Sequence, residues 1–191
     1  TTFLIWQALP AQRSNERLAD IRIPFLASCA CNAIWIFMWH FDLLFMSLVL
    51  MLGILASLIQ IYRKLNIALS DTSATERWFV HLPFSIYIGW ITVATIANIS
   101  AAQIHWGWDS YGFNAETWTL IKIALAGAIA VTILFRRRDI AFVLVVVWAA
   151  VGITVKHLLT PMVAGGAAVL AIAATLLIVA EFITRPRSAR S

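Results

Sequence analysis

Positive charge is unevenly distributed along this chain. Twelve of the fourteen Lys and Arg residues fall into clusters on one side of a six-helix membrane map. These twelve are Arg13, Arg17, Arg22, Arg63, Lys64, Arg77, Arg136, Arg137, Arg138, Arg185, Arg187 and Arg190. Apolar runs separate the clusters, and the intervening chain reversals are nearly empty of positive charge. Because cytoplasmic loops of membrane proteins carry such an excess of Lys and Arg, the pattern predicts an integral membrane protein whose clustered side faces the cytoplasm.

The composition agrees with this interpretation. The chain is 62% hydrophobic and 12% charged, whereas an average globular domain is about 45–50% apolar and about 25% charged. Anionic lipid headgroups explain the net charge of +5, and no basic stripe with interleaved aromatic residues suggests a nucleic-acid partner. The lipid bilayer is the expected partner. With no targeting segment in the sequence, a bacterial inner membrane is expected, with the C-terminus in the cytoplasm.

Six apolar runs are each long enough to cross a bilayer. They cover residues 22–41, 43–62, 83–103, 118–135, 140–158 and 162–183. Residues 1–9 are mostly apolar but shorter than the roughly 20 residues that a crossing needs, so they are predicted to end a helix that begins earlier. Alternating β patterns are absent, and spanning lipid then requires helices. The predicted fold class is all-α: a polytopic transmembrane helical bundle of six full spans plus the end of a preceding one.

Three local features complete this map. Pro24 is expected in the opening turn of the first span, where its missing N–H costs nothing. The polar segment 63–82 is expected to be an inner loop in water. The last span is rich in small residues, and Ala164 and Ala168 share a face, which lets a neighbouring backbone approach closely. That packing surface serves either the bundle itself or a partner, which would be a second copy of the chain or another subunit of a membrane complex.

Polar side chains within the spans are the candidates for function, because each needs a partner there. On the first span Asn32, Trp35 and Trp39 share one helix face, and on the third span Trp90, Ala94 and Asn98 do so, with Thr95 beside Asn98. Two such faces, each with an amide and an indole, predict a cleft for a flat aromatic ligand. The alternative is structural: the two asparagines bond to each other and the tryptophans fill space.

Other chemistry finds little support. Trp106, Trp108 and Trp118 fit an interfacial aromatic belt. Three of the four histidines, His40, His105 and His157, map to the outer interface, so haem ligation there stays open although a buried axial ligand would lie deeper. Cys29 and Cys31 point about 200° apart on a helix, so no metal site is assigned. No catalytic motif is present, and no catalytic residue is assigned.

The two helix faces carry a resemblance to a known family. The run Asn32-Ala33-Ile34-Trp35, followed by Phe37, Trp39 and Phe41, resembles the Asn-x-x-Trp-Ser-Pro-x-Phe-Phe motif of the tryptophan-rich sensory protein/translocator protein family (TspO/MBR). The run Trp90 to Asn98 resembles that family's Trp-x-x-x-Ala-Thr-x-x-Asn motif. The Ser-Pro of the first motif is replaced by Ile36-Phe37. Residues 1–103 would form the family's helical core, incomplete at its N-terminus, and residues 104–191 a three-helix transmembrane extension with a basic cytoplasmic tail.

The resemblance implies a function. The family binds porphyrins, haem and, in animal members, cholesterol, with proposed roles in tetrapyrrole sensing, transport or breakdown. By this resemblance, the ligand-binding role carries over to six candidate residues: Asn32, Trp35, Trp90, Ala94, Thr95 and Asn98. The predicted function is a non-catalytic membrane receptor or carrier for a hydrophobic planar small molecule, with porphyrin or haem as the implied ligand. The alternatives are a structural or assembly subunit of a larger membrane complex and, on family proposals alone, a tetrapyrrole-degrading enzyme.

Overall fold

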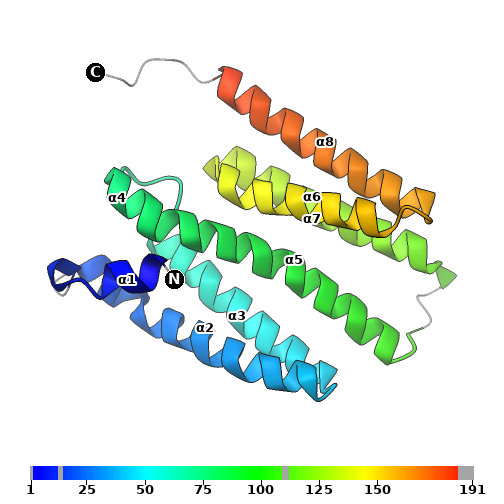
Figure 1. Cartoon of the computed structure of the whole chain (residues 1–191), viewed down its shortest axis with the longest axis horizontal. Coiled ribbons are helices and arrows are strands. Elements are labelled where there is room, and N and C mark those ends of the chain that lie inside the picture. Colours follow the sequence, from blue (N-terminus) through cyan, green and yellow to red (C-terminus); the bar gives the residue numbers. More distant parts are fainter. Residues whose placement is uncertain (1, 13–14, 109–111, 185–191) are drawn as a thin grey trace.

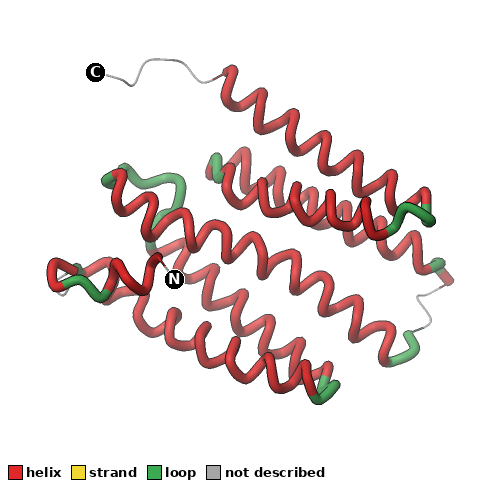
Figure 2. The backbone as a smooth tube through the Cα atoms, viewed as in Figure 1, coloured by secondary structure: helices red, strands yellow, loops and turns green. Residues whose placement is uncertain are grey.

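The computed structural model describes residues 2–12, 15–108 and 112–184, and the described chain is helical without strands (Figures 1 and 2). The predicted all-α fold class is confirmed. In chain order the elements are α1 (Thr2–Gln7), the 3₁₀ helix η1 (Pro10–Gln12), α2 (Glu16–His40), α3 (Leu44–Lys64), α4 (Ala74–Glu76), the π-helical turn η2 (Arg77–His81), α5 (Leu82–His105), α6 (Ala115–Arg137), α7 (Ile140–Lys156) and α8 (Pro161–Thr184).

Five of these helical segments are long and apolar enough to cross a membrane: Glu16–His40, Leu44–Lys64, Ala74–His105, Ala115–Arg137 and Pro161–Thr184. The sixth predicted span corresponds to α7, which has 17 residues. At 1.5 Å per residue α7 is about 26 Å long, at the short end of what a hydrocarbon core requires. The helices form a polytopic bundle with five candidate spans, and α7 is a shorter apolar helix.

The helices pack in chain order with one exception. α2 packs on α3, α3 on α5, and α5 on α7, while α6 and α7 both pack on α8. Figure 1 shows α2 and α3 at one edge of the bundle and α8 at the other. One small-residue face of α8 points inward, since Ala167, Ala171 and Ala174 are all buried. That face of the last helix packs within the bundle, against α6 and α7.

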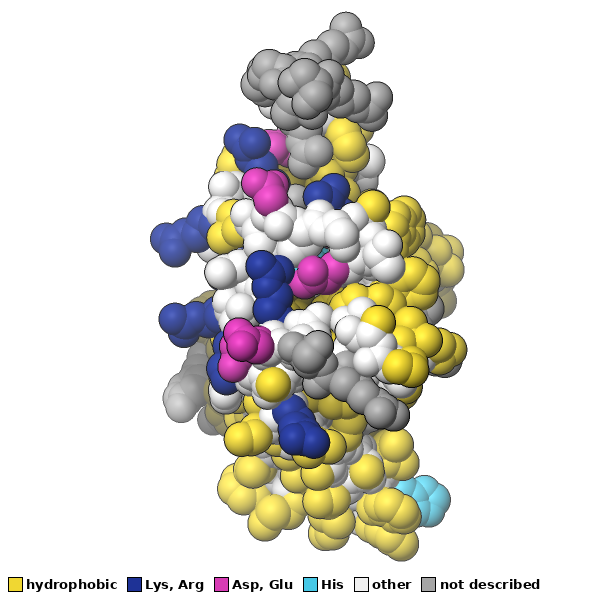
Figure 3. All heavy atoms as spheres, turned by 90° about the vertical axis from the view of Figure 1, so that its left-hand side faces the viewer, with side chains coloured by type: hydrophobic (Ala, Val, Ile, Leu, Met, Phe, Trp, Pro, Cys, Tyr) yellow, Lys and Arg dark blue, Asp and Glu magenta, His cyan; other side chains and the backbone are white. Residues whose placement is uncertain are grey.

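The basic residues gather at one end of the bundle, seen face-on in Figure 3. The described members lie on the first turns of α2, at the end of α3, in η2 and at the end of α6: Arg17, Arg22, Arg63, Lys64, Arg77, Arg136, Arg137 and Arg138. Arg13, Arg185, Arg187 and Arg190 lie outside the described residues. We call this the basic end. The opposite end carries the turns that follow α2, α5 and α7. The structure thus brings the described members of the sequence clusters to one surface.

Two predicted boundaries were wrong. Residues 74–82 were expected in a loop but are helical and continue into α5, because Ser73 caps the helix by accepting a hydrogen bond from the Glu76 amide (3.1 Å). The first span begins at Glu16, capped by Asn15, rather than at residue 22. Pro24 therefore lies inside α2. A proline there removes the hydrogen bond to the carbonyl four residues earlier, that of Asp20. Lys64 Nζ of α3 replaces it, donating to Asp20 O at 2.8 Å.

We expect Lys64→Met to lower the free energy of unfolding by about 0.5–1 kcal/mol, because the Asp20 carbonyl then has only water as a donor. Solvent exposure of this bond keeps the effect small. Arg63→Met is the matched control, since Arg63 is exposed at the preceding position and forms no such bond with a described residue. Unfolding in mixed detergent micelles measures both. Equal losses in the two variants would show that Lys64 does not compensate for Pro24.

Candidate functional site

The six predicted ligand residues occupy two helices that do not face each other directly. Asn32 and Trp35 lie on α2, and the other four lie on α5. α3 packs against both helices, whereas α2 and α5 make little direct contact. The structure therefore places the two groups of candidate residues in different surroundings, one on each side of α3.

Asn98 joins α5 to α3. It is 3% exposed, and its Nδ2 donates to Ser47 Oγ of α3 at 2.9 Å. The amide thus pairs with Ser47 rather than with Asn32. Its Oδ1 is buried without a hydrogen-bond partner among the described residues. Thr95 is also buried and donates to the Ile91 carbonyl of its own helix (2.7 Å), while Ala94 packs against the core.

On α2, Trp35 is partly buried against the core and stacks on Trp39, with ring centroids 6.0 Å apart. The indole Nε1 of Trp35 is buried without a described partner. Asn32 is half-buried one turn away. A buried indole N–H without an acceptor is uncommon. Trp35 therefore holds an available donor, the kind of group that fixes the orientation of a bound polar atom.

Trp90 lies on the face of α5 that meets α7. It is 45% exposed, and its ring centroid lies 5.3 Å from that of Trp148 on α7. The two indoles line an apolar groove of about 460 Å³ together with Leu82, Ile86, Leu144 and Val145. An adjoining apolar groove of about 580 Å³ places Trp78, Tyr87 and Trp90 around one space. Neither groove includes another of the six predicted residues.

α5 and α7 come close beside this groove because α5 has a glycine at the crossing. A Cβ at Gly89 would lie 3.2 Å from the Phe142 carbonyl oxygen and 3.2 Å from Val145 Cβ. Any side chain at residue 89 would push the two backbones apart. Gly89 therefore sets the spacing of the helices that carry Trp90 and Trp148.

A buried carboxylate ties three helices together at the basic end. Asp139 is 4% exposed and caps α7 by accepting from the Phe142 amide at 3.1 Å. Tyr62 Oη of α3 donates to its Oδ2 at 2.6 Å, and Ser85 Oγ of α5 donates to both carboxylate oxygens. Arg137 lies over the Tyr62 ring at 4.8 Å. The serine meets the aspartate directly with no histidine between them, so this cluster is not a Ser-His-Asp triad.

Sequence reasoning missed this cluster. Asp139 directly follows three arginines, while Tyr62 and Ser85 lie in apolar runs. One signal could have found it: an Asp directly before an apolar run is a typical N-cap. The cluster borders a polar cavity of about 370 Å³ that also includes Arg77, His81 and Arg138. His81 is 5% exposed, and its Nε2 has no described hydrogen-bond partner.

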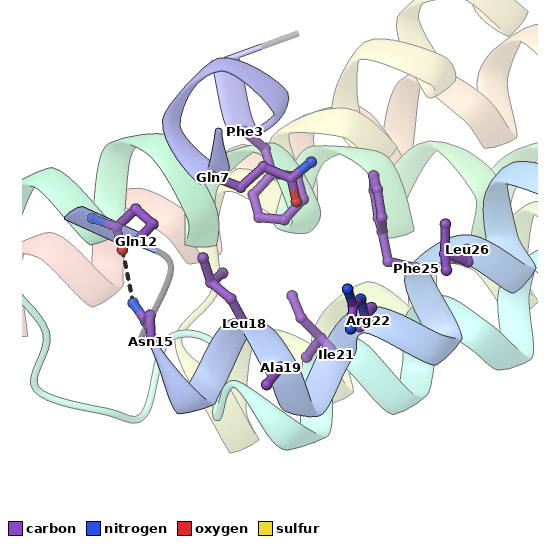
Figure 4. A pocket seen from close by; sticks show the side chains of 10 residues that line it. All are labelled: Phe3, Gln7, Gln12, Asn15, Leu18, Ala19, Ile21, Arg22, Phe25 and Leu26. Carbon is purple, nitrogen blue, oxygen red and sulfur yellow. Dashed lines mark hydrogen bonds between the residues drawn. The ribbon is translucent and has the colours of Figure 1, made fainter. Parts of the chain in front are cut away.

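A further cavity of about 360 Å³ lies between α1 and the start of α2 (Figure 4). Phe3 and Gln7 of α1 form one side, and Leu18 and Phe25 of α2 form the other. The edge of the Phe3 ring packs against Phe25, with centroids 5.1 Å apart. A hydrogen bond from Asn15 to Gln12 (2.9 Å) closes the turn beside it. The apolar interior and amide rim of this cavity indicate an amphipathic environment.

Comparison with known proteins identifies the family. The model of the family described as TSPO-like protein matches residues 1–180, a range that includes the helices with the Asn32–Trp35 and Trp90–Asn98 runs and continues through α7 into α8. No curated protein and no solved structure matches the chain. A match of this length, together with an apolar helical bundle whose basic residues gather at one end, establishes both the family and the membrane setting. The chain is an integral membrane protein that belongs to the TSPO-like protein family.

Proposed function

We propose that this protein is a non-catalytic membrane receptor or carrier for a hydrophobic planar ligand, with a tetrapyrrole such as porphyrin or haem as the ligand class. The observation that carries the proposal is the groove in which Trp90 and Trp148 meet. Indole faces stack on planar aromatic systems, and the remaining wall is aliphatic. Trp78 and Tyr87 extend the same aromatic surface along α5 toward the basic end. Membership of the TSPO-like family supports the same ligand class.

The other candidate residues have supporting roles in this proposal. Asn98 anchors α5 to α3, Thr95 donates to a carbonyl of its own helix, and Ala94 packs against the core with a small side chain, so α5 presents Trp90 in a defined position. Asn32 and Trp35 lie on α2, on the other side of α3 from the groove, where the indole N–H of Trp35 has no partner among the described residues and offers a separate polar contact. The ligand site then belongs to the unit of residues 1–103, completed by Trp148 from the three-helix extension of residues 104–191.

The orientation follows from the charge distribution. The basic end faces the cytoplasm of a bacterial inner membrane, because Lys and Arg are retained on that side. The groove at Trp90 then opens laterally toward lipid, which gives a hydrophobic ligand access from the bilayer. Selective labelling of single cysteines introduced at residue 66, at the basic end, and at residue 159, at the opposite end, tests this orientation.

We expect Trp90→Ala to weaken porphyrin binding about tenfold, because one indole contributes on the order of 1–1.5 kcal/mol through stacking and burial. The fold is expected to persist, since Trp90 is 45% exposed. Quenching of tryptophan fluorescence by added protoporphyrin measures the affinity. Trp106→Ala is the matched control, because Trp106 is 53% exposed and lies at the far end of α5. Unchanged affinity in Trp90→Ala would reject the groove as the site.

A structural or assembly subunit is the second candidate function. The observation behind it is the outer face of α8, where Val169, Ile172, Leu176 and Phe182 are all more than half exposed. Such a face meets either lipid or another membrane protein. Stoichiometric partners that remain bound in mild detergent would support this candidate, and a monodisperse particle of monomer mass would contradict it.

A further inference from the structure

A cavity between α5, α6 and α7 lies in the half of the bundle away from the basic end. Its volume is about 370 Å³, within the range of roughly 300–1,000 Å³ that is typical of ligand pockets. Leu170 of α8 closes one side. Apolar side chains form most of the wall: Val93, Ile96, Ala97, Ile123, Ala126 and Val146. The cavity shares no lining residue with the groove between Trp90 and Trp148.

The polar lining residues are all at the outer part of this cavity, nearest the end opposite the basic end. Ser100 lies near the end of α5, Thr119 and Lys122 lie in the first half of α6, and Lys156 ends α7, followed by His157. The mid-membrane residues Val93, Ala126 and Val146 are apolar. The cavity is therefore amphipathic along the membrane normal: polar toward the surface and apolar toward the membrane centre.

The two lysines are the two positive residues of the chain that lie outside the basic clusters. Neither forms an ion pair with a described residue, and no acidic residue is among those that line the cavity. Lys122 is half-buried within a membrane-spanning helix. Charge in this position is costly without a partner and marks a functional site by default. Lys122 and the exposed Lys156 both line this otherwise apolar cavity, and a bound anion would supply the partner that they lack among the described residues.

We infer that this cavity binds an anionic phospholipid from the leaflet opposite the basic end. One acyl chain occupies the apolar part between α5, α6 and α7. The phosphate lies between Lys122 and Lys156. The Ser100 and Thr119 hydroxyls beside it donate to the Ile96 and Ala115 carbonyls of their own helices, so the two lysines supply the charge contacts. The polar-to-apolar order of the cavity matches the order of headgroup and chain in such a lipid, and the positive charge selects against zwitterionic and neutral lipids. The inference is independent of the proposed tetrapyrrole site.

Native mass spectrometry of the full chain in mild detergent tests the inference. The protein is titrated with phosphatidylglycerol and, separately, with phosphatidylcholine of the same acyl chains. The first phosphatidylglycerol molecule is expected to bind more tightly than the first phosphatidylcholine molecule. Lys122→Gln and Lys156→Gln are each expected to weaken it about fivefold, because a Lys near the membrane surface contributes about 1 kcal/mol toward an anionic lipid. Phosphatidylcholine binding is expected to remain unchanged.

Two further variants sharpen the test. Arg63→Gln removes one exposed positive charge at the basic end and is expected to leave the affinity for the first phosphatidylglycerol unchanged. Ala149→Phe fills the apolar part of the cavity without changing a charge, and is expected to weaken that lipid. Equal losses in Arg63→Gln and Lys122→Gln would overturn the inference, since binding would then depend on net charge alone. Combining Lys122→Gln with Lys156→Gln gives a third check, and an unchanged affinity for phosphatidylglycerol in that double variant would also overturn the inference. The inference would equally fail if the lysine variants lost haem binding but kept phosphatidylglycerol binding.

Discussion

Replacing Asp139 with Ala is expected to lower the free energy of unfolding by about 3 kcal/mol. The substitution leaves the Tyr62 and Ser85 hydroxyls without their buried acceptor, and an unsatisfied buried polar group costs about 1–3 kcal/mol. It also removes the cap of α7, which contributes about 1 kcal/mol. Because α3, α5 and α7 all meet at this carboxylate, their relative positions depend on it.

The control for this effect is Asp20→Ala. Asp20 is an exposed aspartate at the same end of the bundle, so the variant removes the same charge without breaking a buried network. Thermal unfolding in detergent measures both variants. Asp139→Asn is expected to fall between them, since the amide oxygen can still accept from one hydroxyl and cap the helix. Equal stability of Asp139→Ala and Asp20→Ala would show that the network does not hold the three helices together.

Gly89→Leu is expected to destabilise the protein by about 3 kcal/mol and to weaken porphyrin binding as well. The new side chain would meet the α7 backbone at Phe142, which cannot move aside as a flexible side chain can. Overpacking of this kind typically costs 1–3 kcal/mol, and sometimes more. Separation of α5 from α7 also moves Trp90 away from Trp148, so affinity is expected to fall together with stability.

Gly152→Leu is the matched control on α7, because nothing lies within 4 Å of the position of its Cβ. An exposed Leu is a better helix former than Gly, so this variant is expected to be as stable as the wild type or slightly more stable. Unfolding and fluorescence quenching are measured on both variants. Wild-type behaviour of Gly89→Leu would mean that the close approach of α5 and α7 is not required for the groove.

Much of the fold could be predicted from the sequence because the membrane restricts the possibilities. Apolar runs bounded by basic clusters locate the helices, and the described members of those clusters lie at one end of the bundle. The sequence left open whether the small residues of the last helix face the bundle or a partner, and Ala167, Ala171 and Ala174 are buried within the bundle. The errors arose where polar capping residues lie beside apolar runs. Ser73 starts a helix within a stretch that reads as loop, and Asn15 starts α2 before the proline that seemed to begin it.

The candidate site was harder to predict, because helix periodicity identifies which residues share a face but not which helix that face meets. Asn98 and Trp90 lie on the same helix, yet one bonds to α3 and the other meets Trp148 of α7. The partner of Trp90 lies 58 residues later in the chain, and no local pattern links the two. Asp139 was missed for the same reason, since its partners Tyr62 and Ser85 come from two other helices.

The most direct test of the proposed function is a visible absorption spectrum of the full-length protein, purified gently from its native membrane. The account predicts a Soret band from a bound tetrapyrrole, and it predicts that this band shifts or disappears in Trp90→Ala and Trp148→Ala while remaining in Trp106→Ala. A colourless protein whose tryptophans are not quenched by added porphyrin would contradict it, and would favour the structural-subunit function instead.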